Sequence, residues 1–351
     1  MRNLTKTLLA TATLAVVAAP AAALDETTLS VVGSWSGLPL HKQHESPFWT
    51  QTLPEAAGGK IAVEMTTFDQ MGVNGGDVFR LLNDGVFDVG MTVADYTVGD
   101  APELEGLDVP LIATDPAAAR KMVEAARPLV EDILRDRFGA KLLALAPYPP
   151  QVVFCNAAIA GLEDLKGKKI RGSGRMTTKF LEALGAEGVN LGFSEVPGAL
   201  ERGVIDCAIT GSGSGYSAGW WESSTHLMTL PLGGWDSVAT AMNLDKWQSL
   251  SAETQAFLLE QVRAGFEAPA WDALAGAVDN DIACLTGKGD CASGEPAAMT
   301  LVEPSSQDFE VANKVLRETV LPDWAERAGQ DWARRWNESV GAATGVTVEL
   351  N

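Results

Sequence analysis

The sequence has few of the residues on which most enzyme chemistry depends. Only three histidines occur in 351 residues, His41, His44 and His226, and none belongs to a His-Glu-x-x-His motif. No Gly-x-Ser-x-Gly elbow is present, and the four cysteines form no Cys-x-x-Cys pair, so the common patterns of a hydrolase nucleophile and of a zinc site are missing. We therefore expect no catalytic residue, no metal and no cofactor.

Long apolar segments are also scarce. The apolar run at 8–19 is too short to cross a bilayer, and no later stretch reaches the ~18 apolar residues that a transmembrane helix needs. Arg2 and Lys6 precede this run and three alanines at 21–23 follow it, which is the pattern of a cleaved signal peptide. We expect residues 1–23 to be removed and the mature chain to be exported to the periplasm.

Basic residues are outnumbered by acidic ones, 26 to 46, and the net charge is −20. Such a surface repels nucleic acid, so we expect none as a partner. An anionic ligand would need a local cation to overcome this field. A buried arginine at contact distance can do so, because the field of distant surface charges is screened beyond roughly 8 Å in physiological salt.

The four cysteines suit an oxidising compartment. Cys284 and Cys291 bracket a short segment with two glycines, which predicts a disulfide-closed hairpin. Cys155 and Cys207 allow two interpretations: they could pair, or they could be buried free thiols that pack as small apolar side chains.

Strand-like and helix-like segments alternate in two sets separated by Pro147, Pro149 and Pro150, which stiffen the chain as a hinge would. The first set predicts strands at 28–32, 60–67, 88–93 and 141–146, and helices at 43–53, 77–83 and 116–136. The second predicts strands at 152–154, 168–172, 188–191 and 204–210, and helices at 175–184 and 194–202. Helical runs follow at 251–283 and 307–340.

This alternation predicts an α/β fold of two lobes, each a mostly parallel sheet flanked by helices. A second crossing between the lobes is expected at Gly233 and Gly234, before a further strand at 238–243. We place lobe I at 24–148 and 236–276, and lobe II at 149–235 and 277–351.

The segment from Lys168 to Arg175 is the strongest candidate for a ligand site. A strand ends at Arg171, a Gly-Ser-Gly turn follows and a helix begins. Strand ends in α/β sheets and helix N-termini are common places for anionic ligands, and an arginine fork suits a carboxylate. Arg171 could also be an ordinary surface residue in a solvated turn. The glycine-rich loop at 211–215 could likewise cradle a ligand oxygen or be a flexible connection.

Four ordered motifs resemble those of a known family. They are Asp164-Leu-Lys-Gly-Lys-Lys-Ile-Arg171, Leu181-Glu-Ala-Leu-Gly185, Phe193-Ser-Glu-Val196 and Ala199-Leu-Glu-Arg-Gly203-Val-Ile-Asp206. This set is similar to the dicarboxylate-binding type of solute-binding subunit in tripartite ATP-independent periplasmic (TRAP) transporters. Further similarities occur at 83–90, at Val109-Pro-Leu111 and at Asn243 with Trp247, so the resemblance covers nearly all of the mature chain.

The resemblance implies a periplasmic-binding-protein-like fold in which crossing strands and one long hinge-spanning helix join the lobes. It also implies closure on a small organic acid and delivery to integral-membrane permease subunits, with uptake driven by an ion gradient. Arg171 corresponds to the arginine that pairs with the ligand carboxylate in this family. We expect the protein to be a monomer. Two other functions are the alternatives to transport: a sensor subunit that presents its ligand to a membrane receptor, or an exported enzyme acting on a small acid.

Two positions depart from the family pattern. Some members have a second arginine in the cleft where this chain has Gln151, and Thr210 stands where an asparagine often contacts the ligand. These changes and nearby aromatic residues suggest a ligand with one carboxylate and an apolar or aromatic body. The expected ligand-binding residues are therefore Arg171, Gln151, Trp35, Phe193, Thr210, Tyr216, Trp235 and Asp236.

Overall fold

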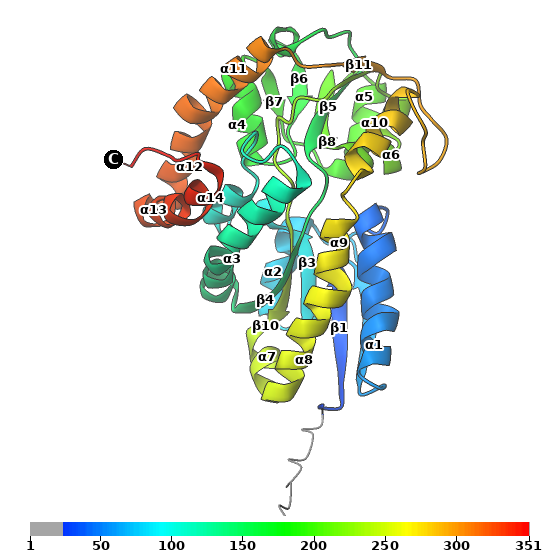
Figure 1. The fold of residues 1–351 in the computed structure, drawn as a ribbon, viewed down its shortest axis with the longest axis vertical. Coiled ribbons are helices and arrows are strands. Elements are labelled where there is room, and N and C mark those ends of the chain that lie inside the picture. Colours follow the sequence, from blue (N-terminus) through cyan, green and yellow to red (C-terminus); the bar gives the residue numbers. More distant parts are fainter. Residues whose placement is uncertain (1–23, 351) are drawn as a thin grey trace, which may run out of the picture.

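The computed structural model describes residues 24–350, so the signal peptide expected at 1–23 lies outside the described residues. Two sheets, each covered by helices, form two lobes that follow one another along the long axis of the molecule (Figure 1). The predicted two-lobed α/β fold is thus confirmed. No helix between residues 24 and 350 combines the length and the apolar character needed to cross a membrane.

The sheet of lobe I has five strands in the order β2-β1-β3-β10-β4. β1 is parallel to β2 and to β3, and β10 runs antiparallel to both of its neighbours. All five strands have buried residues, as expected when helices cover a sheet. Their bounds are β1 Thr27–Gly33, β2 Ile61–Thr67, β3 Val89–Val93, β4 Ala140–Ala146 and β10 Val238–Asn243.

The sheet of lobe II has six strands in the order β11-β9-β5-β8-β6-β7. Here β5 is antiparallel to its neighbours β8 and β9, while β6 is parallel to β7 and β8. The bounds are β5 Gln151–Cys155, β6 Lys169–Arg171, β7 Glu187–Val189, β8 Cys207–Gly211, β9 His226–Met228 and β11 Thr300–Val302. β6 ends at Arg171, as the sequence predicts.

The longest described helix is α3, Pro116–Phe138, and its sequence accounts for where it begins and ends. Asp115 caps its first turn by accepting a hydrogen bond from Ala118 N, Pro116 takes the first position, and Gly139 ends it with a left-handed φ of 52°. Other helices of lobe I include α1 Leu53–Ala56, α2 Val78–Asn83, α7 Leu244–Ser249 and α8 Ala252–Val262. Helices of lobe II include α4 Arg175–Ala183, α5 Val196–Glu201 and α6 Ser212–Ser217.

Three segments cross between the lobes. The chain passes from β4 to β5 through 147–150 and returns from β9 to β10 through 229–237. These two crossings lie against each other, because Tyr148 N donates to Trp235 O at 3.1 Å and Gln151 N donates to Gly234 O at 3.2 Å. The crossing expected at Gly233 and Gly234 is therefore where the sequence places it.

The third crossing is the helical run expected at 251–283. It continues from α8 through a π-helical turn, Arg263–Glu267, into α9, Ala268–Asp272. It then breaks at 273–276, where Gly276 has a φ of 78°, before α10 begins at Ala277 and ends at Thr286. The long helix between the lobes is thus two helices joined by a turn at the boundary (Figure 1).

The C-terminal helices contact both lobes. α11, Ser306–Val315, leads through the turn Leu316–Val320 past α4, and α12, Leu321–Ala328, packs on the turn Pro102–Leu107 of lobe I. α13, Gln330–Trp336, and the short α14, Ala342–Thr344, lie against α3. The boundary that we draw between the lobes at residue 276 stays a prediction.

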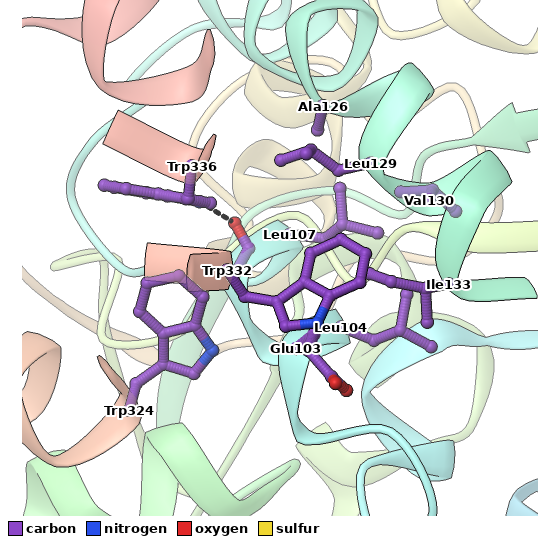
Figure 2. Close-up of a pocket in the computed structure, with 11 residues that line it drawn as sticks. Glu103, Leu104, Leu107, Ala126, Leu129, Val130, Ile133, Trp324, Trp332 and Trp336 are labelled. Atoms are coloured by element: carbon purple, nitrogen blue, oxygen red, sulfur yellow. Dashed lines mark hydrogen bonds between the residues drawn. The ribbon is translucent and has the colours of Figure 1, made fainter. Parts of the chain in front are cut away.

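Tryptophans anchor these C-terminal helices to lobe I (Figure 2). Trp336 Nε1 donates to Gly106 O at 2.8 Å and Trp324 Nε1 donates to Pro102 O at 3.1 Å. A Cβ atom at Gly106 would lie 2.8 Å from the Trp324 ring, so only glycine lets the rings approach this backbone. The cavity that they enclose with α3 is about 20 Å³, room for about one water molecule, so we interpret it as packing.

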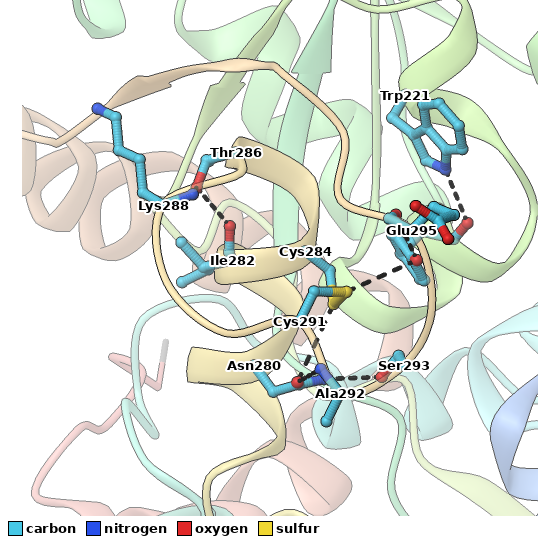
Figure 3. The surroundings of a disulfide bond; sticks show 11 residues. Trp221, Asn280, Ile282, Cys284, Thr286, Lys288, Cys291, Ala292, Ser293 and Glu295 are labelled. Atoms are coloured by element: carbon cyan, nitrogen blue, oxygen red, sulfur yellow. Dashed lines mark hydrogen bonds between the residues drawn. A yellow bond between two sulfur atoms is a disulfide. The ribbon is translucent and has the colours of Figure 1, made fainter.

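Both cysteine pairs form disulfides. Cys155 and Cys207 face each other on the antiparallel strands β5 and β8, which resolves the two interpretations left open by the sequence. Cys284, on α10, is bonded to Cys291 in the following loop, the pair expected from the sequence (Figure 3). Asn280 holds the same loop by accepting from Ala292 N at 2.8 Å and donating to Ser293 Oγ at 2.7 Å.

The two disulfides should contribute unequally to stability. Replacing Cys155 and Cys207 together with alanine should lower the free energy of unfolding by about 2–4 kcal/mol, because the cross-link restricts the unfolded chain. Replacing Cys284 and Cys291 should cost less, since they are 7 residues apart rather than 52. Urea unfolding of the two double variants measures both losses, and a larger loss from the shorter loop would contradict the chain-entropy explanation.

Candidate functional site

A cavity of about 750 Å³ lies between the lobes. Lobe I contributes the segments after β1 and β3, and lobe II contributes the segments after β6 and β7. These are carboxyl ends of strands, where α/β sheets place ligands. The lining side chains include Trp35, Asn74, Asp95, Tyr96, Arg171, Arg175, Lys179 and Phe193.

Arg171 lies in this cavity and is 3% exposed. Its Nε donates to Leu191 O at 3.1 Å and its Nη1 donates to Ile209 O at 2.7 Å, so two backbone carbonyls fix the plane of the guanidinium. Carbonyls orient the charge without neutralising it. No carboxylate of residues 24–350 comes within 4.0 Å of it, so an entering anion would find an unpaired cation.

Aromatic rings surround the arginine. Its Cζ lies 5.8 Å from the centre of the Trp220 ring, and Trp220 is 5.2 Å from Phe193. Phe193 of lobe II meets Trp35 of lobe I at 5.4 Å, so this ring pair joins the lobes across the cleft. A second cavity of about 300 Å³ shares Trp35 and Phe193 with the first and is also lined by Trp220. The aromatic pair therefore divides the cleft.

The Gly-Ser-Gly turn brings the lobes together in an unexpected way. Its Gly174, which precedes α4, has no room for a side chain, because a Cβ atom there would lie 1.3 Å from Oδ2 of Asp95. The sequence predicts that glycines here let a ligand approach. In the structure, the group that approaches Gly174 is a carboxylate of the opposite lobe.

Asp95 and Tyr96 are site residues that the sequence analysis missed. Both lie in the turn Ala94–Thr97 directly after β3 and line the cavity. Trp35 Nε1 donates to the Tyr96 hydroxyl at 3.3 Å, and burial raises the Tyr96 pKa to about 12. Their position at the carboxyl end of a buried strand is the feature of the sequence that could have identified them as site residues, since neither residue type is distinctive by itself.

Three buried carboxyl groups gather behind the cavity. Burial is the largest cause that raises the pKa of Asp95 and of Asp108, and neighbouring carboxylates, with Asp236 among them, raise both further. The pKa of Asp236 is raised to about 7, again chiefly by burial, although Arg171 lowers it. Arg171 thus lies near buried carboxyl groups whose raised pKa values favour their neutral forms.

The other expected ligand-binding residues do not line the cavity. Gln151 is fully buried and its Nε2 donates to the carboxylate of Asp108 at 3.1 and 3.3 Å. Trp235 Nε1 donates to Ala113 O at 2.8 Å, and Asp236, with a φ of 40°, donates its backbone N–H to Asp108 Oδ1 at 2.9 Å. These residues form the crossing segments beneath the site.

Thr210 and Tyr216 also lie outside the cavity lining. Thr210 is 3% exposed on β8, opposite Val152 of β5. The Tyr216 hydroxyl donates to Glu295 O at 2.8 Å and its ring stacks on Trp221, so it belongs to the surroundings of the Cys284–Cys291 loop. Of the eight expected residues, the structure brings Arg171, Trp35 and Phe193 together in the lining.

Residues 36–271 match the model of a protein family described as bacterial extracellular solute-binding protein, family 7. The chain belongs to this family. Family 7 is a family of solute-binding receptors, and the matched segment contains β3, β6 and β7, whose carboxyl ends line the cavity.

Curated relatives agree with this family. The chain is 26% identical over 212 residues to the ectoine-binding periplasmic protein TeaA of Halomonas elongata, an alignment that covers 58% of this chain and 61% of TeaA. It is 28% identical over 137 residues to a solute-binding protein of Albidiferax ferrireducens, covering 39% and 40% of the two chains. The chain thus spans less than two thirds of the length of these relatives.

Solved structures of similar proteins share the fold over nearly their whole length. A Bordetella pertussis extracytoplasmic solute receptor binding pyroglutamic acid superposes with a TM-score of 0.78 at 22% identity, over 90% of this chain and 99% of that chain. The TeaA structure gives 0.78 at 18% identity, over 91% and 100%. A TRAP periplasmic solute-binding protein of Sulfurospirillum deleyianum with bound succinate gives 0.74 at 19%, over 90% and 100%.

Gly174→Ala tests the contact between the lobes. The added Cβ would collide with Asp95, while the extended backbone at Gly174 (φ −146°) accepts any residue. We expect the variant to fold with nearly unchanged melting temperature but to bind its ligand at least about tenfold more weakly, because the lobes would be held apart. Calorimetric titration beside Gly99→Ala, whose Cβ meets no neighbour and whose backbone is not left-handed, separates this effect from that of adding a methyl group elsewhere. Unchanged affinity in Gly174→Ala would contradict the contact.

The raised pKa of Asp236 predicts how stability depends on pH. Its folded-state pKa of about 7 exceeds the ordinary value of 3.8, so protonation favours the folded state. This contribution is complete below about pH 4 and is lost as the pH rises through about 7. Without ligand, the free energy of unfolding of Asp236→Asn, relative to that of the natural protein, should therefore rise by on the order of 2 kcal/mol from pH 5 to pH 8.

Urea unfolding at the two pH values measures that gain. Asp331→Asn is the matched control, because the Asp331 side chain is 87% exposed and should show no such gain. If the free energy of unfolding of Asp236→Asn differed from that of the natural protein by the same amount at both pH values, the Asp236 carboxyl would be ionised throughout this range.

Proposed function

We propose that this protein is the extracytoplasmic receptor of a TRAP-type secondary transporter and captures a small carboxylate-bearing solute between its lobes. The observation that carries this is Arg171: a buried guanidinium, fixed by two carbonyls and without a carboxylate partner, in a cavity of about 750 Å³. Such a cavity has the size of a small-molecule site. A dry site strengthens the attraction between a cation and a carboxylate.

The relatives support the same class of ligand. Ectoine, pyroglutamic acid and succinate, which are named for the similar proteins, each carry a carboxylate. We infer that Arg171 takes this group, and that Trp35 and Phe193 cover the rest of the solute when the lobes close. A transporter needs such reversible enclosure, because the solute must leave again at the membrane.

The membrane partners follow from the family. We propose that the ligand-bound protein docks on integral-membrane permease subunits in the periplasm and acts there as a monomer. Loss of solute uptake in cells that lack the receptor, with permease subunits still present, is the expected result.

Arg171→Ala is the direct test of the site. Its loss would leave the solute carboxylate unpaired in the cleft, which should weaken binding by about 2–5 kcal/mol. A thermal-shift screen of the natural protein against small organic acids identifies ligands, since a ligand at 100 times its Kd adds about 2.7 kcal/mol of stability.

Two further variants sharpen this test. Arg171→Lys keeps the charge but loses the planar fork, so it should bind more weakly than the natural protein and more tightly than Arg171→Ala. Arg334→Ala removes a half-exposed arginine of α13 and should bind normally. A ligand that binds Arg171→Ala as tightly as the natural protein would refute the proposed site.

A further inference from the structure

Asp95 is a buried carboxylate without a partner of its own. It is 3% exposed, and neither Oδ1 nor Oδ2 has a hydrogen-bond donor among residues 24–350. Leaving such a group unsatisfied costs free energy, so a buried polar group without a partner needs an explanation. Because Asp95 lines the cavity, a donor from a bound solute can supply what the protein does not.

Three of the nearby cations have other partners. Arg327, which attracts Asp95, donates from both Nη atoms to Glu105 and from Nε to Asp323 at 3.0 Å. Lys179 Nζ forms an ion pair with Asp323 Oδ1 at 3.3 Å. Arg171 donates to two carbonyls of its own lobe and forms no ion pair with Asp95.

The charge of the cavity lining is balanced rather than positive. Arg171, Arg175 and Lys179 are matched by Asp95, Glu182 and Glu195, and Asp236 adds a carboxyl close enough to affect both Asp95 and Arg171. A solute with only negative charge would gain at Arg171 but would leave both Asp95 oxygens without a donor. A solute with no net charge, whose positive and negative groups are separated, would gain at both places.

The two residues that would bind such a solute lie on different lobes. Asp95 follows β3 of lobe I, whereas Arg171 ends β6 of lobe II, and the two lobes touch where Asp95 meets Gly174. A carboxylate held by Arg171 and an N–H cation held by Asp95 would therefore connect the lobes through the solute itself.

We propose that Asp95 accepts hydrogen bonds from a positively charged N–H group of the solute while Arg171 holds its carboxylate, so that the protein selects zwitterions over simple organic anions. This inference rests on the proposed function and names its substrate class.

Two pairs of compounds with similar size and shape test the proposal. Proline carries a cationic ring nitrogen where pyroglutamate carries a neutral lactam, and ectoine carries a cationic amidine where orotate carries a neutral ring. Calorimetric titration of the full-length mature protein at pH 7.5 should show that at least one zwitterion binds about tenfold or more tightly than its paired anion.

Asp95→Asn should then reverse that preference. The isosteric amide keeps the volume but removes the acceptor charge, so the zwitterion should lose about 10- to 100-fold in affinity, while the paired anion binds as well or better. Asp100→Asn, in the following turn and 42% exposed, is the control and should leave both affinities unchanged. Melting temperatures of both variants establish that they fold.

The outcomes separate this inference from the function on which it rests. An anion that binds as tightly as its zwitterion, with binding that depends on Arg171, would overturn the selectivity and leave the receptor function standing. A zwitterion preference unchanged in Asp95→Asn would overturn the role of Asp95. If none of the four compounds and no other small carboxylate bound, both proposals would fall together.

Discussion

The structure depends on keeping a positive charge buried where the two lobes meet. An isolated guanidinium away from water is costly unless its donors are satisfied and its charge finds a partner. Here the carbonyls of Leu191 and Ile209 satisfy two donors, and the Trp220 ring lies beneath the plane of the group. The charge itself has no carboxylate partner among the described residues, which is why we propose this position as the ligand site.

Much of this architecture could be predicted from the sequence. The alternation of apolar strand segments with amphipathic helices, such as Pro116–Phe138, indicates two α/β lobes, because local periodicity survives in the fold. A strand end followed by a glycine turn and a helix makes Arg171 a candidate, and the family resemblance is what assigns it the ligand carboxylate. Trp35 and Phe193 stand at such junctions too, and both line the cavity.

The rest depends on contacts between distant parts of the chain. Gln151 and Asp236 bond to Asp108 because two crossing segments lie side by side, and no local pattern announces that pairing. Asp95 resembles many surface aspartates in sequence, and only the approach of Gly174 from the other lobe buries it. Tyr216 is expected among the aromatic residues of the cleft, but its hydroxyl donates to Glu295 O in the segment that follows the Cys284–Cys291 disulfide, another contact between distant parts of the chain.

The C-terminal helices give the molecule a stiff edge. α12 is bonded to lobe I through Arg327 and Glu105 and to lobe II through Asp323 and Lys179, whereas Trp35 and Phe193 meet through ring contact alone. Ion pairs and hydrogen bonds break at higher cost than one aromatic contact when partly buried. α12 therefore connects the lobes in addition to the three chain crossings, so these ion pairs must break or move with one lobe whenever the lobes separate.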